Sequence, residues 1–535
     1  MRSRRLALPF LAAIGTAALL AGCTTAPQDD DSAHVSPPEH AVATAAASDA
    51  ATRAIEVSRA LFESSPVAVV ANSGDAADVG RAAEEAVRRH APVLIASPGA
   101  GATGTGAGVT GTGATSAAGD ASSTDASSTD ASSTEATSPG EPSTADTTDT
   151  AQADGAAADL AAELDRLGAT RASSSDDDGD GDDDAGGTLD GDADTVAVAT
   201  SDPGNAAAVA TARAAGVDVH VLPDGVSDLQ AAPDVLDALG ASSTTHALLI
   251  GAEFAGRADL GWSVAAARTD ARLPGGSQRL FPDHRFVAIY GAPGAPSLGV
   301  LGEQDVAQTI DRAKAVAAEY QPYSDRPVVP MLEIIATVAA GDAGADGDYS
   351  NELAVSSIEP YVDAAADAGV YIVLDLQPGR SDFLTQAKLY ESLLTKPNVG
   401  LALDAEWRLG PDQVPLRQIG SVSADEVNAT SAWLADLVAA KALPPKMFVL
   451  HQFRLSMLQD RSRIDTTRPE LETLIHADGQ GSQPDKQATW NALHVDAPAG
   501  VAWGWKNFYD EDKPMLTPEQ TMTGVSPVPD LVTYQ

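Results

Sequence analysis

Residues 401–407 (Leu-Ala-Leu-Asp-Ala-Glu-Trp) contain the pair of carboxylates best placed to do chemistry in this sequence. Asp404 and Glu406 are two residues apart and directly follow an apolar run that predicts a β-strand. Because alternate side chains of a strand point to the same side, we expect them to share a face, with Cα atoms about 7 Å apart. Close carboxylates push each other's pKa apart. Hydrolysis of a glycosidic bond needs this division, with Glu406 as general acid and Asp404 as its orienting or stabilising partner.

Polar or aromatic residues also stand at the ends of the other predicted strands in the C-terminal half. The strand-like runs are residues 285–290, 327–335, 370–376, 399–403, 446–450, 471–476 and 501–505. The residues at their carboxyl ends are Tyr290, Glu333, Asp375 with Gln377, Asp404 with Glu406, His451 with Gln452, His476 with Asp478, and Trp505 with Lys506. In a barrel of parallel strands these ends converge on the mouth that carries the active site. We therefore predict that Asp375 and Glu333 line the same catalytic cleft.

Aromatic and polar residues near this pair predict a substrate-binding surface. Trp503 and Trp505 alternate with Ala502 and Gly504, so both face one side of their strand. Aromatic faces of this kind can stack on sugar rings, and packing in the core of a barrel is the alternative use of the same side chains. The predicted substrate-binding residues are Tyr290, Trp407, His451, Gln452, Trp503, Trp505 and Lys506.

Structural roles are the alternative for the predicted catalytic residues. Asp404 could cap a loop or pair with Arg408, and Glu333 and Asp375 could be hydrogen-bond acceptors. His451 is better explained as a core histidine than as a metal ligand, because no H-x-H or H-E-x-x-H spacing accompanies it. We therefore predict no metal and no cofactor. The sequence also has no nucleophile elbow, phosphate loop or Rossmann glycine fingerprint, which disfavours serine hydrolases, nucleotide-binding proteins and redox enzymes.

The Asp404-Ala405-Glu406 run resembles the strand-end D-x-E of barrel lysozymes and the last part of the chitinase motif D-x-x-D-x-D-x-E. Ala402 and Val399 stand where the two earlier aspartates of the chitinase motif belong. The resemblance implies a glycoside hydrolase-like activity on cell-envelope glycan. The rival interpretation is a barrel that binds glycan, or acts as a scaffold, without turnover.

The elements around these residues predict a TIM-like (β/α) barrel over residues 280–535. Most of the predicted strands are followed by a helical pattern, at residues 304–320, 358–368, 383–394 and 425–439. Seven visible repeats favour a barrel with one further strand that the pattern does not reveal. An open, doubly wound sheet is the alternative architecture.

Residues 51–260 predict a separate α/β domain, because helical and strand patterns alternate along them. Residues 53–62, the Val-rich run 67–71 and the turn Asn72-Ser73-Gly74-Asp75 resemble the opening of the cell-wall-binding repeats of Gram-positive surface proteins. In those repeats Phe-Pro-Asp usually follows the turn, where this chain has Ala-Ala-Asp at residues 76–78. The resemblance implies a three-layer α/β domain that binds the cell wall.

Low-complexity sequence interrupts this domain at residues 101–155 and 171–193. The first segment repeats Ala-Ser-Ser-Thr-Asp, and its Gly, Ala, Thr and Ser residues cannot bury enough apolar surface to fold. The second is rich in aspartate, but Asp183 and Leu189 stand where a calcium-binding EF-hand loop requires Gly and Glu. We predict that both segments are disordered, the second as a solvated acidic linker.

The N-terminus predicts an exported lipoprotein. Arg2, Arg4 and Arg5 precede a mainly apolar stretch that is too short to span a bilayer, which is typical of a signal peptide over residues 1–22. The run Leu-Ala-Gly-Cys at residues 20–23 resembles the lipobox of bacterial lipoproteins, which implies lipidation of Cys23 and an extracytoplasmic protein anchored to the membrane. Residues 23–50 predict a lipidated tether. Export by the general secretory route or by the twin-arginine route stays open.

Composition narrows the partners of the mature chain. The net charge of -43 disfavours nucleic acid and direct adhesion to anionic lipid or anionic wall polymer. With Cys23 as the one cysteine, disulfides, thiolate zinc sites and thiol nucleophiles are excluded. The expected partners are the membrane, through the lipid, and envelope glycan. As a whole the chain resembles actinobacterial lipoproteins of the cell-wall-binding-repeat type.

Overall fold

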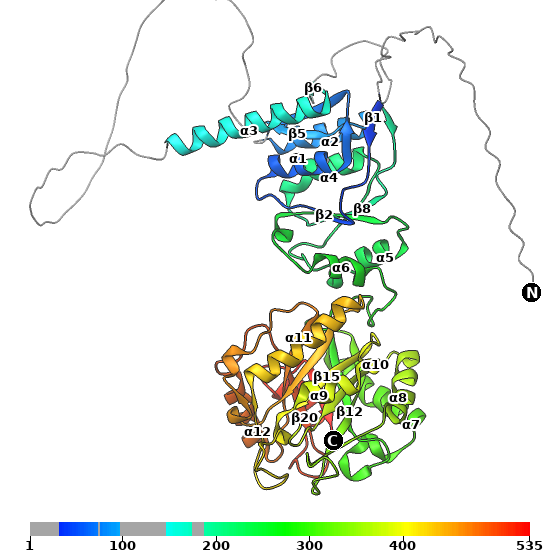
Figure 1. Ribbon diagram of the computed structural model, residues 1–535, viewed down its shortest axis with the longest axis vertical. Coiled ribbons are helices and arrows are strands. Elements are labelled where there is room, and N and C mark those ends of the chain that lie inside the picture. The colour runs from blue at the N-terminus through cyan, green and yellow to red at the C-terminus, as the bar shows by residue number, and fades with distance from the viewer. Residues whose placement is uncertain (1–31, 73–74, 97–145, 174–186) are drawn as a thin grey trace, which may run out of the picture.

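The computed structural model describes residues 32–72, 75–96, 146–173 and 187–535 (Figure 1). The predicted signal peptide, Cys23, residues 97–145 and most of the acidic segment lie outside these residues. Among the described residues, no helix has the length and apolar character needed to cross a membrane.

The described residues before position 268 form three small sheets. One parallel sheet has the order β5-β4-β6 (Val93–Ala96, Val67–Asn72, Thr170–Ser173). A second parallel sheet has the order β2-β10-β8-β9 (Val42–Ala45, His246–Ile250, Thr195–Ala199, Asp218–Val221). The third, β3-β1-β7 (Phe62–Ser64, Ser32–Val35, Thr188–Asp190), mixes antiparallel and parallel pairs.

The helices described in this N-terminal part are α1 (Ala50–Leu61), α2 (Ala76–Arg89), α3 (Asp146–Leu167), α4 (Ala206–Ala214), α5 (Pro233–Ala241) and α6 (Leu260–Ala267). Aspartate residues cap the N-termini of two of these helices, α1 and α2. Asp49 accepts the N–H of Thr52 at 2.8 Å, and Asp75 accepts the N–H of Ala77 at 2.9 Å. The predicted α/β class is confirmed, whereas the cell-wall-binding type stays a prediction.

Short strands correct the predicted tether and the predicted disorder. β1 and β2 lie within residues 23–50, and β2 pairs with β10 along its whole length. β6 and β7 have residues within the segment 171–193, and α3 begins inside the segment 101–155. These strands have only three or four residues, which are too few to give an apolar period. They are stabilised by pairing with strands far away in the chain, which the local sequence does not show.

Residues 285–534, all of them described, contain eight parallel strands that close into a barrel. In barrel order the strands are β11 (Arg285–Gly291), β12 (Val328–Ala339), β14 (Tyr371–Leu376), β15 (Val399–Asp404), β17 (Lys446–His451), β19 (Leu471–Ala477), β20 (Ala502–Asn507) and β21 (Leu531–Tyr534). β11 pairs with both β12 and β21, which excludes the open doubly wound sheet. β21 is the strand that the sequence pattern does not reveal.

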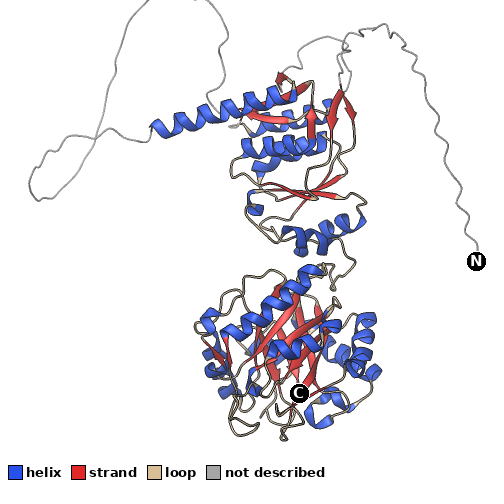
Figure 2. Ribbon diagram, in the orientation of Figure 1, coloured by secondary structure: helices blue, strands red, loops and turns tan. Residues whose placement is uncertain are grey.

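Helices surround these strands (Figure 2). They are α7 (Val306–Ala318), α8 (Val355–Ala368), α9 (Phe383–Leu389), α10 (Glu391–Leu394), α11 (Ala424–Ala440), α12 (Gln483–His494) and α13 (Pro518–Gly524). Outside the barrel, β13 (Ser350–Glu352) pairs antiparallel with the end of β12, and β16 (Val422–Ser423) pairs with β18 (Leu458–Gln459). The helices before α12 match the predicted ones within a few residues.

Alternate residues of each barrel strand face inward and form one apolar cluster. Its members from the strands are Phe286, Ala288, Val329, Met331, Tyr371, Val373, Ala402, Met447, Val449, Leu474, Ala502 and Leu531. The residues between them pack outward against the helices, as Ile372, Leu401 and Leu450 do. Because the side-chain period of a strand is two, this alternation fixes which residues point into the barrel at its mouth.

Candidate active site

Eight buried side chains, one from each barrel strand, meet at the carboxyl-terminal ends of the strands. Each follows an inward-facing apolar residue or glycine of its strand by two positions. They are Tyr290, Glu333, Asp375, Asp404, His451, His476, Lys506 and Thr533. The predicted convergence of polar residues at one mouth is therefore confirmed. These groups form a buried cluster of histidine and carboxylate side chains at the face where barrel enzymes do chemistry.

His451 is the centre of this cluster. Its Nε2 lies 2.7 Å from Oε1 of Glu333, and its Nδ1 lies 2.8 Å from Oδ2 of Asp478. The hydroxyl of Thr533 donates to the second oxygen of Glu333 at 3.3 Å. Burial lowers the pKa of His451, but Glu333 and Asp478 outweigh this effect and raise the pKa well above its usual value. The two carboxylates therefore favour the protonated form of His451.

Asp375 belongs to a second set of contacts beside His451. Tyr290 donates its hydroxyl hydrogen to Oδ2 of Asp375 at 2.8 Å and accepts a hydrogen bond from Gln377 at 3.2 Å. The ammonium of Lys506 lies 3.6 Å from the centre of the Tyr290 ring, a cation–π contact. Burial raises the pKa of Asp375 to about 6, and the charge of Glu333 adds to this effect while His451 opposes it.

Asp404 and Glu406 do not share one face of a strand, which corrects the predicted geometry. β15 ends at Asp404, and residues 405–407 form a single 3-10 turn. Oδ1 of Asp404 accepts the backbone N–H of Glu406 at 3.2 Å, so Asp404 caps this turn. One carboxylate oxygen of Asp404 also lies within 4.8 Å of ligand atoms of His451 and Asp478. Asp404 thus both holds the turn that carries Glu406 and belongs to the buried cluster.

The carboxylates of the mouth fall into two groups by the direction of their pKa shifts. Burial raises the pKa of Asp404 well above its usual value, and the charge of Asp375 adds to this shift. Burial and the charge of Asp478 together raise the pKa of Glu406 to about 7. Burial also raises the pKa of Glu333 and of Asp478, but their interactions with His451 outweigh burial. As a result, the pKa of Glu333 is lowered to about 2, and the pKa of Asp478 lies below its usual value. Protonated and ionised carboxyl groups therefore lie side by side near neutral pH.

Several polar atoms of the cluster have no hydrogen-bond partner. They are Oδ1 of Asp375, Oδ1 of Asp478, and both ring nitrogens of His476. Burying a polar group without a partner costs about 1–3 kcal/mol. Such atoms are rare in folded proteins and call for an explanation, of which a catalytic role or an ion is one. Their concentration at the barrel mouth indicates a place built for a ligand.

Two of the predicted substrate-binding residues face away from the mouth. Trp503 and Trp505 face outward because Gly504 and Lys506 take the inward positions of β20, and both pack edge-on against Trp490 of α12. The alternative role in core packing is therefore the correct one for these two residues. The side-chain oxygen of Gln452 accepts a hydrogen bond from Arg461 at 3.1 Å, so Gln452 stabilises the loop after β17.

The other predicted positions are near the mouth. Trp407 is partly exposed in the same 3-10 turn as Glu406, so its role as a sugar platform stays a prediction. The pairing of Asp404 with Arg408 is not observed, because Arg408 binds Glu426 at 2.8 Å.

The structure adds Thr533 to the residues of the mouth, and it shows that Asp478, which the sequence already places at a strand end, contacts His451. The sequence marks Asp478 only as a polar residue after a strand, and its contact with His451 depends on the pairing of β17 with β19. Thr533 lies on β21, for which the pattern gives no strand. In both cases the position of the residue depends on strand pairing in the folded barrel, which the local sequence does not show.

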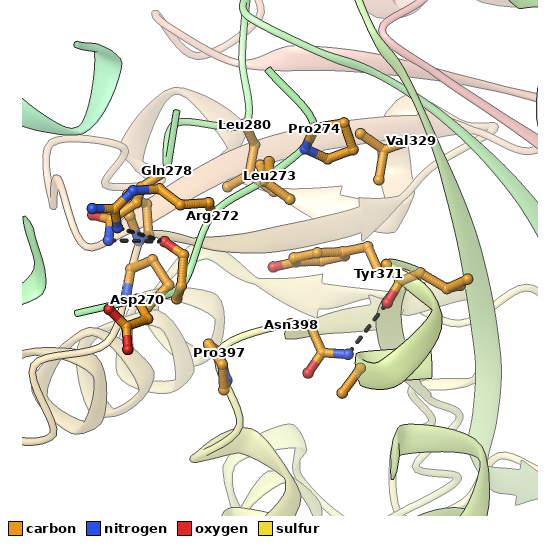
Figure 3. A pocket seen from close by; sticks show the side chains of 16 residues that line it. Asp270, Arg272, Leu273, Pro274, Gln278, Leu280, Val329, Tyr371, Pro397 and Asn398 are labelled. Atoms are coloured by element: carbon orange, nitrogen blue, oxygen red, sulfur yellow. Dashed lines mark hydrogen bonds between the residues drawn. The ribbon is translucent and has the colours of Figure 1, made fainter. Parts of the chain in front are cut away.

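A separate cavity of about 270 Å³ lies at the opposite, amino-terminal end of the barrel strands (Figure 3). Its lining includes Val329 and Tyr371, near the starts of β12 and β14, and Asn398, whose side-chain amide donates to the carbonyl of Val370 at 3.2 Å. Arg272 and Gln278, from the segment before the barrel, also line it. None of the predicted site residues lines this cavity.

Neither a family model nor a curated protein matches the chain. Among solved structures, it is similar to a truncated form of 3-deoxy-D-arabino-heptulosonate 7-phosphate synthase from Thermotoga maritima. The two sequences are 14% identical, the match covers 42% of this chain and 75% of the synthase chain, and the TM-score is 0.21. It is also similar to an enolase from Pseudomonas fluorescens with bound magnesium, potassium and tartrate. The two sequences are 12% identical, the match covers 58% of this chain and 61% of the enolase chain, and the TM-score is 0.23.

Because both TM-scores are far below 0.5, these likenesses carry no argument about this chain. Its strand order and its site define the class: a TIM-barrel protein with a buried cluster of histidine and acidic side chains at the barrel mouth.

Proposed function

We propose that the protein is a surface lipoprotein whose barrel mouth hydrolyses cell-envelope glycan, with Glu406 as the general acid. The observation that carries the proposal is the position of Glu406. It is partly exposed in the turn above the cluster, whereas Glu333, Asp375 and Asp404 are buried below it. With its pKa raised to about 7, Glu406 holds a proton near neutral pH, as a general acid must.

The neighbouring carboxylates supply the second requirement of this chemistry. A glycosidic bond breaks through an oxocarbenium-like transition state, which carries positive charge and is stabilised by a nearby carboxylate. Oδ1 of Asp478 has no partner, and its charge is the largest electrostatic influence on Glu406. Asp478 is therefore our candidate for the stabilising carboxylate, and Asp404 positions the acid through its hydrogen bond to the turn.

The N-terminal features support a location at the cell surface. The lipobox-like run before Cys23 supports anchoring to the outer face of the membrane. The cell-wall-binding resemblance of residues 53–78 supports contact with the wall. Because the chain carries a net charge of -43, a neutral glycan is a better partner than an anionic polymer.

The test incubates the purified mature chain with isolated cell-envelope glycan and measures new reducing ends. The wild type should release them, and Glu406→Gln should lower the rate by about 10²–10⁴-fold while binding to the glycan persists, because glutamine keeps the shape but supplies no proton. Glu391→Gln, which alters an exposed carboxylate on α10, is the matched control and should keep the wild-type rate.

Two results would count against the proposal in different ways. Glycan binding without cleavage by the wild type would support a lipoprotein that holds glycan without turnover. Equal cleavage rates for the wild type and Glu406→Gln would remove Glu406 from the chemistry.

A further inference from the structure

His476 is a buried histidine that the structure leaves unsatisfied. Its side chain is fully buried, yet neither ring nitrogen has a hydrogen-bond partner. His284 provides the contrast, since it is equally enclosed but has a carbonyl oxygen 2.9 Å from Nδ1 and another 2.6 Å from Nε2. A neutral imidazole carries one donor and one acceptor, so an unpartnered ring in the interior is costly. His476 therefore lacks a partner that a ligand can supply.

The unsatisfied ring faces two other side chains that can bind a metal. Nδ1 of His476 lies 3.9 Å from Oε2 of Glu333, and Oε1 of Glu333 lies 2.7 Å from Nε2 of His451. One ligand atom from each of the three residues lies within 4.8 Å of the others. Ligand atoms bonded at about 2.1 Å to a tetrahedral ion are about 3.4 Å apart. The separations of 2.7 Å and 3.9 Å, which involve the two different oxygens of Glu333, lie on either side of this value, so the three side chains are close enough to share one ion after small rearrangements.

Neighbouring residues hold these side chains in the orientation that a metal site requires. Asp478 lies 2.8 Å from Nδ1 of His451, which directs Nε2 of the same ring toward Glu333. Such a carboxylate–histidine pair is the usual outer partner of a metal-binding histidine. The hydroxyl of Thr533 donates a hydrogen bond to Oε2 of Glu333. Gly504 makes room for His476, because a Cβ atom there would lie 2.7 Å from Cδ2 of the ring.

The mouth is also rich in side chains that can bind a cation. Five carboxyl groups share it with one lysine and two histidines: Glu333, Asp375, Asp404, Glu406 and Asp478 against Lys506, His451 and His476.

We propose that Glu333, His451 and His476 bind a divalent transition-metal ion of the Zn²⁺ type. The ion takes the place of the proton in the hydrogen bond between His451 and Glu333. Two imidazoles and one carboxylate are a donor set found in catalytic zinc sites, where a fourth position stays open for water or substrate. Imidazole ligands suit Zn²⁺, whereas Mg²⁺ prefers oxygen ligands alone. The inference goes beyond glycan cleavage and does not depend on it.

The test titrates the full mature chain, freed of metal with a chelator, with ZnCl₂ in a calorimeter. The wild type should bind one Zn²⁺ per chain and should not respond to MgCl₂. Asp478→Asn should weaken Zn²⁺ binding by about 10–100-fold, and Glu333→Gln and His476→Ala should weaken it by more, because they remove ligands rather than an outer partner. His220→Ala, which removes a partly exposed histidine beside Asp218 on β9, controls for surface binding and should change nothing.

Thermal unfolding separates lost binding from lost folding. Zn²⁺ should raise the unfolding temperature of the wild type, because it binds only the folded chain, and should leave Glu333→Gln unchanged. Glutamine keeps the shape of glutamate, so this variant tests the site even where His476→Ala does not fold. The inference is overturned by the absence of saturable Zn²⁺ binding in the wild type, or by binding that persists in Glu333→Gln. Glycan cleavage without Zn²⁺ binding would refute this inference alone, and Zn²⁺ binding without cleavage would refute only the proposed hydrolysis.

Discussion

Lys446, the first residue of β17, allows a direct test of how this barrel holds a buried charge. The side chain is fully buried, and its Nζ donates to the carbonyl oxygens of Lys396 at 2.6 Å and Val399 at 2.7 Å. Burial lowers the pKa of Lys446 from 10.5 to about 7. A neutral amine still has two N–H groups for the two carbonyls, so the folded protein can give up the third proton without losing either bond.

This pKa shift predicts a slope in stability with pH. Between pH 7 and about 10.5 the unfolded chain keeps the proton of Lys446 and the folded chain does not, so the free energy of unfolding rises with pH. The rise is at most about 1.4 kcal/mol per pH unit, and about 5 kcal/mol over the whole range. Lys446→Met removes the titrating group, so its stability should lack this slope. The variant also removes the hydrogen bonds from Lys446 to the carbonyls of Val399 and Lys396, of which the second keeps the N–H of Val399 at 3.3 Å, and this loss costs about 1–3 kcal/mol at any pH.

The assay is urea unfolding at several pH values from 7 to 10, followed by tryptophan fluorescence. Five of the six tryptophans lie beyond residue 400, so the signal reports mainly on the barrel. The stability difference between the wild type and Lys446→Met should grow in favour of the wild type as pH rises. Lys441→Met, which alters an exposed lysine, should show no such trend. A difference that stays constant from pH 7 to 10 would refute the reasoning.

Three further predictions concern the anchor, the insert and the outer layer of the barrel. Cys23→Ser should move the protein from the membrane fraction to the soluble extracytoplasmic fraction on cell fractionation, and unchanged membrane retention would contradict the lipid anchor. Deletion of residues 101–140, whose sequence lacks an apolar period, should shift the unfolding temperature little, and loss of cooperative unfolding would show that they stabilise the fold. Trp505→Ala should destabilise the barrel by about 3–5 kcal/mol in urea unfolding, because the indole is buried against α12, without weakening glycan binding by the folded protein. A selective loss of glycan affinity would restore Trp505 as a sugar platform.

Local sequence patterns predicted the barrel because each long strand is an apolar run that ends at a polar residue. β14 and β15 are examples, with six buried residues each. β21 has four residues and no such run, and β1 and β2 are equally short, so nothing local marks them. Their stability comes from partners elsewhere in the chain, which a window along the sequence does not contain.

The candidate site was predicted at the level of its strand ends and not at the level of its contacts. The alternation of β20 follows from the sequence, but its phase relative to the barrel axis depends on closure, so the sequence alone leaves the sugar-platform and core-packing roles of Trp505 open. The spacing of His451 and His476 matches no metal motif, because the two histidines meet across neighbouring strands in register. The 3-10 turn at Glu406 does not follow from the local sequence pattern, because it depends on the hydrogen bond by which Asp404 caps it.

The central claim, that the barrel mouth cleaves glycan with Glu406 as the acid, is tested most directly by the pH dependence of kcat/KM. The pKa of Glu406 is raised to about 7, and a general acid works in its protonated form. Cleavage of envelope glycan by the wild type should therefore be constant below pH 7 and fall about tenfold per pH unit above it. In Glu406→Gln the residual rate should be lower by about 10²–10⁴-fold and should lack this alkaline limb. A wild-type profile that stays flat from pH 6 to 9, or the same limb in both proteins, would contradict the account.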